Sequence, residues 1–446
     1  MEDVLIIGAG LSGLSAAMDL TRAGRRVTIL EKWKVVGGRC ADWVDDGMPV
    51  ESGLHRWLGF YRALPRLFKK AGLDHQDALI WGDEVQFRLP DGGPRAVLGL
   101  SPLHKPLATF GGWLGNFDLI SPKEKAELAV FFSSGLIDYG LSRSALDQNT
   151  VYEYAKKRGV SEEAITNVLI PLTEGIFFLP PERYSMMILM GLLAPGVKRP
   201  HTLRVGSFAG GMTDVMCGPI ADALRERGGD VRLDTEVERL AVADGRVRGV
   251  YVNGELIEAA HVVLATALGP AKRLLDAAFP AHPAFAKMMR LATMPAVTLQ
   301  IELDEPALPK DHTVFSPKTL LASYAEQSRT TFRGVPGRLS IDVGQPETFI
   351  DQPPEAVMAA VLADAKRLDL DIADKVRRYR VVSHPEDFYL LGPGAEKLRP
   401  SQATPIPGLT LAGDYTKQPI FCTMEGAVMS GERAAKAVLK GGGGKA

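Results

Sequence analysis

The sequence predicts an α/β protein that combines a Rossmann-type domain, built on a parallel sheet, with an α+β domain that has a mixed sheet and a helical lid. Three observations predict this fold class. The chain opens with a strand, a glycine-rich turn and a helix, and it closes with a second strand, turn and helix. Its 446 residues also exceed what one hydrophobic core usually organises, so we expect about two or three domains.

The first strand, turn and helix have the pattern of a dinucleotide-binding unit. The apolar residues 4–7 enter a turn with glycines at Gly8, Gly10 and Gly13, after which apolar residues recur at helical spacing. Gly8 permits the tight turn, Gly10 leaves room for a pyrophosphate, and Gly13 lets the helix pack closely on the strand. The helix then faces the phosphates with its positive N-terminal end.

An acidic residue follows the next apolar run, residues 27–30. Glu31 has the spacing from the glycines that places a carboxylate beside the ribose hydroxyls of an adenosine. A ribose that carries a 2′-phosphate is disfavoured there. The motif alone leaves both NAD and FAD open.

The second strand, turn and helix favour FAD. The apolar residues 409–412 enter Gly413 and Asp414, and a last helix opens at Met424 and runs to about Leu439. The N-terminus of such a helix can place backbone N–H groups against the pyrimidine edge of an isoalloxazine ring. Negative charge gathers on that edge when the flavin is reduced.

With the Gly37-Gly38-Arg39 sequence, these motifs resemble the flavin-containing amine oxidase superfamily. Within it, residues 51–55, 411–418 and 424–428 are similar to the plant and cyanobacterial type of phytoene and zeta-carotene desaturase, and the similarity spans most of the chain. The resemblance implies a non-covalently bound FAD. It also implies an oxidoreductase that acts on CH–CH bonds and desaturates a long apolar isoprenoid, carotenoid-like, by hydride transfer to flavin N5.

Motif and resemblance together give one set of expected cofactor-binding residues: Gly8, Gly10, Leu11, Ser12, Gly13, Glu31, Lys32, Gly38, Arg39, His55, Arg56, Tyr61, Val237, Gly413, Asp414 and Met424. His55 and Tyr61 are as well explained by structural roles. The resemblance places Cys422 and Thr423 at the substrate. No residue is assigned a catalytic role, because the flavin supplies the reactivity.

Three alternatives stay open. Amine oxidases often carry an aromatic residue just before the Met-Glu-Gly motif, where this chain has Thr423, which favours a desaturase. The desaturases have an Asp-Arg pair where this chain has Asp304 and Glu305, and this departure leaves room for a hydroxysqualene-type dehydroxylase. A non-enzymatic isoprenyl-binding escort protein shares the fold, but such proteins typically lack an intact flavin site.

The alternation of strands and helices, with the resemblance, predicts a discontinuous FAD-binding domain. We expect it over residues 1–75, 205–275 and 395–440, with the substrate domain over 76–204 and 276–394 and a flexible tail over 441–446. The middle part of the FAD domain contains an expected hairpin of residues 246–252 against 254–263.

The composition of the chain limits the classes of binding partner that we expect. The 52 basic and 53 acidic side chains give a net charge of −1, so no nucleic-acid partner is expected, and three scattered cysteines predict neither disulfide nor metal site. The apolar residues 185–194, followed by Lys198 and Arg199, either enter one leaflet of a membrane or form a core helix. We expect a cytoplasmic protein, soluble or peripheral on the inner face of the cell membrane, with a lipophilic substrate and a quinone or oxygen as electron acceptor.

Overall fold

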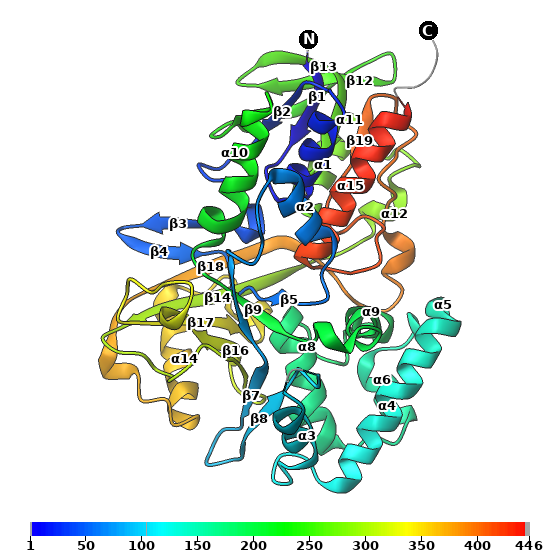
Figure 1. Cartoon of the computed structure of the whole chain (residues 1–446). Coiled ribbons are helices and arrows are strands. Elements are labelled where there is room, and N and C mark those ends of the chain that lie inside the picture. The colour runs from blue at the N-terminus through cyan, green and yellow to red at the C-terminus, as the bar shows by residue number, and fades with distance from the viewer. Residues whose placement is uncertain (1, 104, 442–446) are drawn as a thin grey trace.

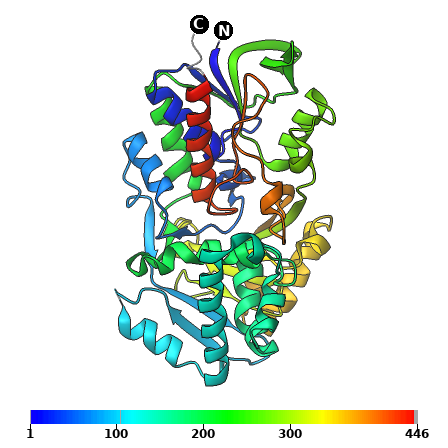
Figure 2. The same cartoon turned by 90° about the vertical axis from the view of Figure 1, so that its right-hand side faces the viewer.

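The computed structural model describes residues 2–103 and 105–441. Two sheet-based halves are stacked on each other, and β1 and α15 both belong to the upper half (Figures 1 and 2). The sheet of the upper half has the strand order β10-β2-β1-β13-β12-β11, and β19 also pairs with β13. The strands from β10 to β13, and β19, run parallel, whereas β12 and β11 extend the sheet as an antiparallel hairpin. Their bounds are β1 (Glu2–Ile7), β2 (Val27–Leu30), β10 (Asp230–Arg232), β11 (Arg239–Ala243), β12 (Arg246–Val252), β13 (Glu255–Leu264) and β19 (Leu409–Leu411).

Helices cover this sheet because its central strands are apolar on both faces. All four residues of β2 are buried, which is typical of a parallel sheet enclosed by helices. α1 packs along α15 so closely that a Cβ atom at Gly431 would lie 2.3 Å from the Ser12 carbonyl oxygen. The helices of this half are α1 (Leu11–Arg22), α2 (Ala63–Ala71), α10 (Gly218–Glu226), α11 (Leu268–Ala278), α12 (Ala286–Met289) and α15 (Met424–Gly441).

The sheet of the lower half is mixed, with the order β18-β14-β17-β16-β15-β7-β8. Every pairing in it is antiparallel except that of β15 with β7. One face carries α13 (Pro346–Phe349) and α14 (Pro354–Arg367), and α14 packs in a separate core against Val297, Leu299 and Ile301. The strands are β7 (Glu84–Arg88), β8 (Arg95–Gly99), β14 (Thr293–Leu303), β15 (Thr313–Phe315), β16 (Leu321–Glu326), β17 (Gly337–Val343) and β18 (Val376–Tyr389).

A helical layer lies beside this sheet and is drawn in cyan and green in Figure 2. α4 starts with a capping box, in which Ser121 and Glu124 satisfy each other's backbone N–H groups. The helices are α3 (Pro106–Leu114), α4 (Pro122–Leu141), α5 (Arg143–Leu146), α6 (Val151–Lys157), α7 (Glu162–Ala164), α8 (Ile170–Phe177) and α9 (Met186–Val197).

Two small sheets complete the fold. β3 (Asp42–Asp45) and β4 (Met48–Glu51) form a hairpin, and β5 (Trp57–Leu58), β9 (Val205–Phe208) and β6 (Leu79–Gly82) form a three-stranded sheet between the halves.

The predicted fold class is confirmed, and so is the hairpin, which β12 and β13 form. The exact domain boundaries stay a prediction. Of the expected tail over 441–446, Gly441 ends α15 and the rest lies outside the described residues.

The apolar run over residues 185–194 belongs to the core. Ser185 precedes α9, and Met186, Ile188 and Met190 are each at most 1% exposed, so this segment has no face left for a lipid leaflet. The membrane interpretation of the run is therefore wrong. Within the described ranges, moreover, none of the helices has the length and apolar character needed to cross a membrane.

Candidate functional site

One cavity of about 1090 Å³ runs from the glycine turn after β1, through the interface of the two halves, to the lower sheet and the helices α8 and α9. Its upper part is lined by backbone, glycine and charged residues, and its lower part by apolar side chains. Of the expected cofactor-binding residues, all but Gly13 line this cavity.

The glycine turn has the close approaches that the sequence predicted. Gly8 has a φ of +103°, and a Cβ atom there would lie 3.0 Å from the carbonyl oxygen of Ala265. Gly13 does not reach the cavity; a Cβ atom on it would lie 2.0 Å from the carbonyl oxygen of Gly8. Gly13 therefore acts by letting α1 approach β1, which brings Leu11 and Ser12, at the start of α1, to the cavity wall.

Glu31 follows β2 and is 6% exposed. Its Oε2 accepts a hydrogen bond of 2.7 Å from the Ala9 N–H, and its Oε1 accepts one of 3.0 Å from the Trp33 N–H. These bonds fix the carboxylate at the cavity wall, and Lys32 and Val237 line the same part of it.

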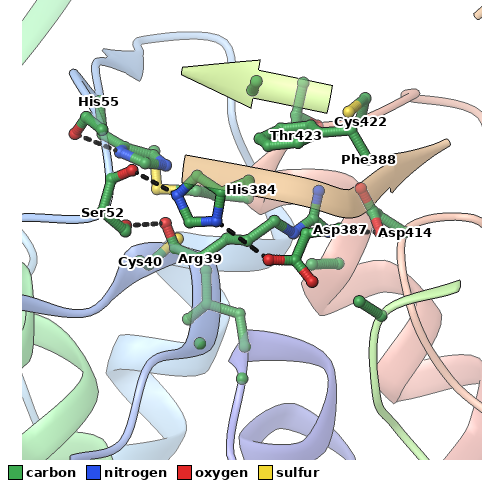
Figure 3. A pocket seen from close by; sticks show the side chains of 18 of the residues that line it. Arg39, Cys40, Ser52, His55, His384, Asp387, Phe388, Asp414, Cys422 and Thr423 are labelled. Atoms are coloured by element: carbon green, nitrogen blue, oxygen red, sulfur yellow. Dashed lines mark hydrogen bonds and ion pairs between the residues drawn. The ribbon is translucent and has the colours of Figure 1, made fainter. Parts of the chain in front are cut away.

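A partly buried ion pair joins the two distant motifs. Arg39 Nη2 lies 2.6 Å from Asp414 Oδ1, and the guanidinium stands 4.9 Å from the centre of the Phe388 ring (Figure 3). Burial opposes the charge on Arg39, but Asp414 outweighs it, so the pKa of Arg39 is raised. Gly38 and Gly413 line the cavity beside this pair.

The loop after β4 is fixed by a chain of hydrogen bonds, drawn in Figure 3. Ser52 Oγ donates to the Arg39 carbonyl oxygen, and His384 Nε2 lies 2.8 Å from the Ser52 carbonyl oxygen. His384 Nδ1 lies 3.0 Å from Asp387 Oδ2. Burial works against ionisation of Asp387, but His384, Arg39 and Lys32 prevail and lower its pKa.

Sequence reasoning missed His384, Asp387 and Phe388, which all line the cavity. They lie on β18, which is far along the chain from Arg39 and Ser52 and pairs with β14. No glycine pattern or spacing marks them, and the polar pair His384 and Asp387 is the one available signal.

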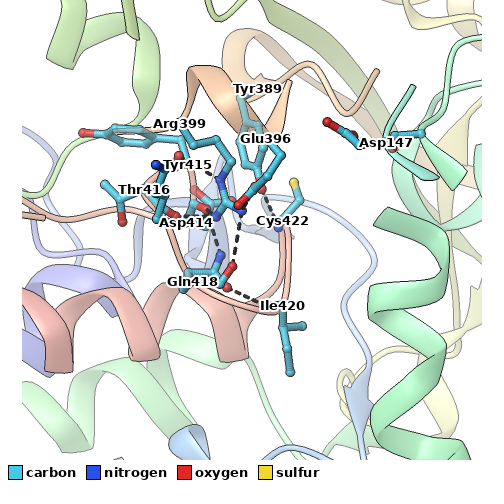
Figure 4. Close-up of polar contacts among 12 residues, drawn as sticks. Asp147, Tyr389, Glu396, Arg399, Asp414, Tyr415, Thr416, Gln418, Ile420 and Cys422 are labelled. Atoms are coloured by element: carbon cyan, nitrogen blue, oxygen red, sulfur yellow. Dashed lines mark hydrogen bonds and ion pairs between the residues drawn. The ribbon is translucent and has the colours of Figure 1, made fainter. Parts of the chain in front are cut away.

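The segment before α15 is held in place by hydrogen bonds from and to three side chains, those of Arg399, Gln418 and Tyr389. Arg399 donates to the carbonyl oxygens of Tyr415, at 3.1 Å, and Asp414, at 3.0 Å, and Gln418 also donates to that of Asp414 (Figure 4). The Cys422 N–H donates to the Tyr389 hydroxyl at 3.0 Å. Cys422 therefore faces the cavity beside Thr423 and Met424.

The Cys422 thiol is not activated. Burial, followed by the nearby charge of Asp414, raises its pKa to about 12, so the sulfur stays protonated at neutral pH.

Arg56 and Tyr61 line the cavity in different ways. The guanidinium of Arg56 is held by Asp311, at 2.5 Å, and by Thr313 Oγ1, at 3.0 Å, and the two side chains of the ion pair are 10% and 2% exposed. Tyr61 precedes α2, whose first N–H groups donate to Glu425 of α15. This bond set fixes Tyr61 next to the segment that carries Met424.

The lower part of the cavity is apolar, except where three neighbouring strands meet. Thr298, Asp342 and Ser323 pair across β14, β17 and β16, and all three line the cavity. Ser323 Oγ donates to Asp342 Oδ2 at 2.9 Å. Burial raises the pKa of Asp342 to about 7. The apolar residues around them include Val85, Phe87, Leu98, Leu100, Leu172, Ile176, Leu192, Leu193 and Phe315.

Asp304 and Glu305, where the sequence departs from the desaturase pattern, do not line the cavity. Glu305 pairs with Lys375 at 2.8 Å and Asp304 with Arg377 at 3.4 Å, and these acids are 61% and 65% exposed. The departure is therefore a surface feature of this structure. Across the described ranges, no cluster of three or more His, Cys, Asp or Glu side chains could hold a metal ion.

The cavity brings the glycine cradle and the two distant motifs together, and comparisons with known proteins identify the family. The model of the family "Flavin containing amine oxidoreductase" matches residues 11–439, so the chain belongs to this family and is a flavin-dependent oxidoreductase.

Relatives and solved structures refine the comparison. A 15-cis-phytoene desaturase of Glycine max is 30% identical over 98% of this chain and 79% of its own length. A zeta-carotene desaturase of Synechocystis sp. is 28% identical over 98% of this chain and 97% of its own length. The crystal structure of an oxidoreductase from Methanosarcina mazei matches with a TM-score of 0.75 at 17% identity, covering 98% of this chain and 100% of that one, and supports the fold alone.

Proposed function

We propose that the protein is an FAD-dependent desaturase of a long, apolar, carotenoid-like isoprenoid. The observation that carries this proposal is the single cavity whose upper part is a dinucleotide cradle and whose lower part is an apolar channel. The names of the relatives point to the same class of substrate.

The upper part of the cavity offers contacts for both ends of FAD, the adenosine end and the flavin end. The residues proposed to contact it are Gly8, Gly10, Leu11, Ser12, Glu31, Lys32, Gly38, Arg39, His55, Arg56, Tyr61, Val237, Gly413, Asp414 and Met424, with Gly13 acting through packing. Glu31 is placed to accept hydrogen bonds from the ribose, and the start of α15 to donate to the pyrimidine edge of the flavin. We propose non-covalent binding, since the raised pKa values of the cavity thiols, about 12 for both Cys40 and Cys422, leave no thiolate to attack the ring.

The lower part of the cavity binds and orients the isoprenoid. When bound, the flavin supplies a two-electron acceptor for hydride. The protein contributes an apolar wall that excludes water, and each buried Å² of substrate contributes about 25 cal/mol to binding. Cys422 and Thr423 are proposed to face the reacting carbons, and a quinone or oxygen is proposed to reoxidise the flavin.

A peripheral membrane contact is proposed at α3 instead of α9. Leu103, Leu107 and Phe117 are 64%, 90% and 61% exposed, and the amine of Lys125 stands over the Phe117 ring. α3 lies at the lower end of the molecule, directly on β8, whose Leu98 lines the cavity (Figure 1). A substrate dissolved in the membrane would thus approach the wall of the cavity at the proposed membrane contact of α3.

Two measurements test the proposed function. The cofactor released by heat should be FAD by chromatography, and a colourless protein that takes up no flavin would contradict the proposal. Under anaerobic conditions, polyenes should bleach the flavin absorbance, whereas amines should not. Bleaching by amines alone would identify an amine oxidase, and bleaching by a hydroxylated triterpene alone would identify a dehydroxylase.

A further inference from the structure

His55 has an unusual position among the titratable residues of the cavity. It follows the loop fixed by Ser52, and its Nδ1 lies 2.8 Å from the Gly53 carbonyl oxygen (Figure 3). A carbonyl oxygen only accepts hydrogen bonds, so Nδ1 must carry the hydrogen. In the neutral imidazole, Nε2 then has a free lone pair.

The lone pair of His55 Nε2 is open to the cavity. Within residues 2–103 and 105–441, Nε2 has no hydrogen-bond partner, and it is not among the buried polar atoms that protein encloses without a partner. Because His55 lines the cavity, the lone pair is available to a molecule bound there.

The neutral form of His55 is the stable one. Burial is the largest cause, and the charge of Arg39, which follows Gly38, and the neighbouring His384 on β18 add to it, so that the pKa of His55 is lowered to about 4 despite the hydrogen bond to Gly53. The imidazole is therefore uncharged throughout the neutral pH range.

The other bases of the central cavity are engaged. Both nitrogens of His384 contact acceptors, and Asp387 is paired with His384. Asp414 is bound to Arg39. Asp342 receives a hydrogen bond on Oδ2, and its Oδ1 is enclosed by protein.

We propose that His55 Nε2 is the base that accepts the proton which the isoprenoid loses during desaturation. This inference rests on the proposed function. One C–H bond breaks and its hydrogen leaves with both electrons to the flavin as hydride. The C–H bond on the neighbouring carbon then gives its electron pair to the new double bond, and its proton goes to Nε2, forming an imidazolium. A weak base suffices, because a carbon next to a developing cation releases its proton readily.

The test uses the holoenzyme and follows flavin reduction in a single anaerobic turnover with 15-cis-phytoene in detergent micelles. With FAD in saturating excess, which offsets any loss of the proposed His55 contact to the cofactor, His55→Gln should be reduced by dithionite like the wild type, while its reduction by phytoene slows about 100-fold. His261→Gln is the matched control, because His261 also has a pKa lowered to about 4 by burial but does not line the cavity. The control should keep the wild-type rate.

The pH profile is the second readout, and it requires no variant. After a rapid pH jump, the wild-type rate should be constant from about pH 6 to 9 and fall only as the pH drops through about 4. NMR of the histidine rings should show His55 as a neutral Nδ1–H tautomer over the same range. This spectrum does not depend on turnover.

The outcomes separate the two proposals. If phytoene reduces the wild type and His55→Gln equally fast, the inference about His55 is wrong and the proposed function stands. A rate that falls as the pH drops through about 7 would assign the role to Asp342 instead. If no isoprenoid reduces the wild-type flavin, the proposed function fails and the inference fails with it.

Discussion

The two parts of the cavity are built on different principles. The upper part depends on where backbone atoms can go: Gly8 and Gly13 bring a strand and a helix within a distance that any side chain would prevent. The lower part is the space that remains between apolar side chains, where strands and helices of ordinary sequence enclose a channel. A backbone cradle tolerates almost no change, whereas an apolar wall tolerates changes that conserve volume and polarity.

The largest effect is expected at Gly13. In Gly13→Ala the added methyl would lie 2.0 Å from the Gly8 carbonyl oxygen, so α1 must move away from β1. We expect a loss of more than about 3 kcal/mol in the free energy of unfolding, with little flavin retained. Chemical denaturation and flavin absorbance measure both. Gly140→Ala is the control, because Gly140 lies in α4 with open space around it, and alanine there should stabilise by roughly 0.5–1 kcal/mol.

Glu31→Arg should come next. It removes an acceptor for the ribose and adds bulk and charge beside it, at an expected cost of about 2–4 kcal/mol in FAD binding, or roughly 30- to 1000-fold in Kd. Fluorescence titration of the apoprotein with FAD measures it. Glu226→Arg, on the exposed end of α10, makes the same charge change away from the cavity and should leave the Kd unaltered. Equal Kd values for the wild type and Glu31→Arg would refute the assignment to the ribose.

Asp342→Asn tests the polar group in the apolar part. Burial raises the folded-state pKa of Asp342 to about 7, above the roughly 3.9 of an unfolded chain. The unfolded chain thus releases the proton first, and stability falls as the pH rises from about 4 to 7. Asparagine avoids this loss, so the variant should be more stable than the wild type at pH 8, by about 4 kcal/mol, and equally stable near pH 4. Urea unfolding at both pH values measures the difference, and destabilisation of equal size at both would contradict it.

The smallest effect is expected at the outer surface of α3. Leu107→Asp should weaken binding to vesicles of phosphatidylglycerol and phosphatidylethanolamine about tenfold, because it removes an apolar contact and adds a repelled charge. Flotation assays measure this binding. Leu141→Asp places the same change on another exposed leucine, at the far end of α4, and should bind as the wild type does. Equal loss in both variants would show that α3 is not the contact.

The sequence predicted the upper part of the cavity well because its constraints are local. A turn that needs Gly8, Gly10 and Gly13, followed by Glu31, leaves a pattern within one short stretch of chain. The second motif, with Asp414, could be recognised in the sequence for the same reason. The ion pair of Asp414 with Arg39 shows that the two motifs lie together in the folded protein.

The rest of the site could not be predicted in the same way because its contacts are remote in the sequence. Asp387 and His384 reach the Ser52 loop through the long pairing of β18 with β14, and Arg56 meets Asp311 across 255 residues. Partners that are so far apart in the sequence form no motif of fixed spacing that could be recognised. The run over 185–194 had a related ambiguity: a uniformly apolar segment suits a lipid leaflet and a protein core equally, and only its neighbours decide.

The central claim is that one cavity has two separable parts, and Leu193→Glu tests it most directly. Leu193 lies on α9 and lines the apolar part of the cavity. FAD titration and anaerobic reduction by 15-cis-phytoene are measured on the same preparation, with Leu141→Glu as the control. We expect an unchanged Kd for FAD and a phytoene reduction at least about tenfold slower. Loss of FAD binding in parallel with reduction, or full reduction by phytoene despite the buried charge, would contradict it.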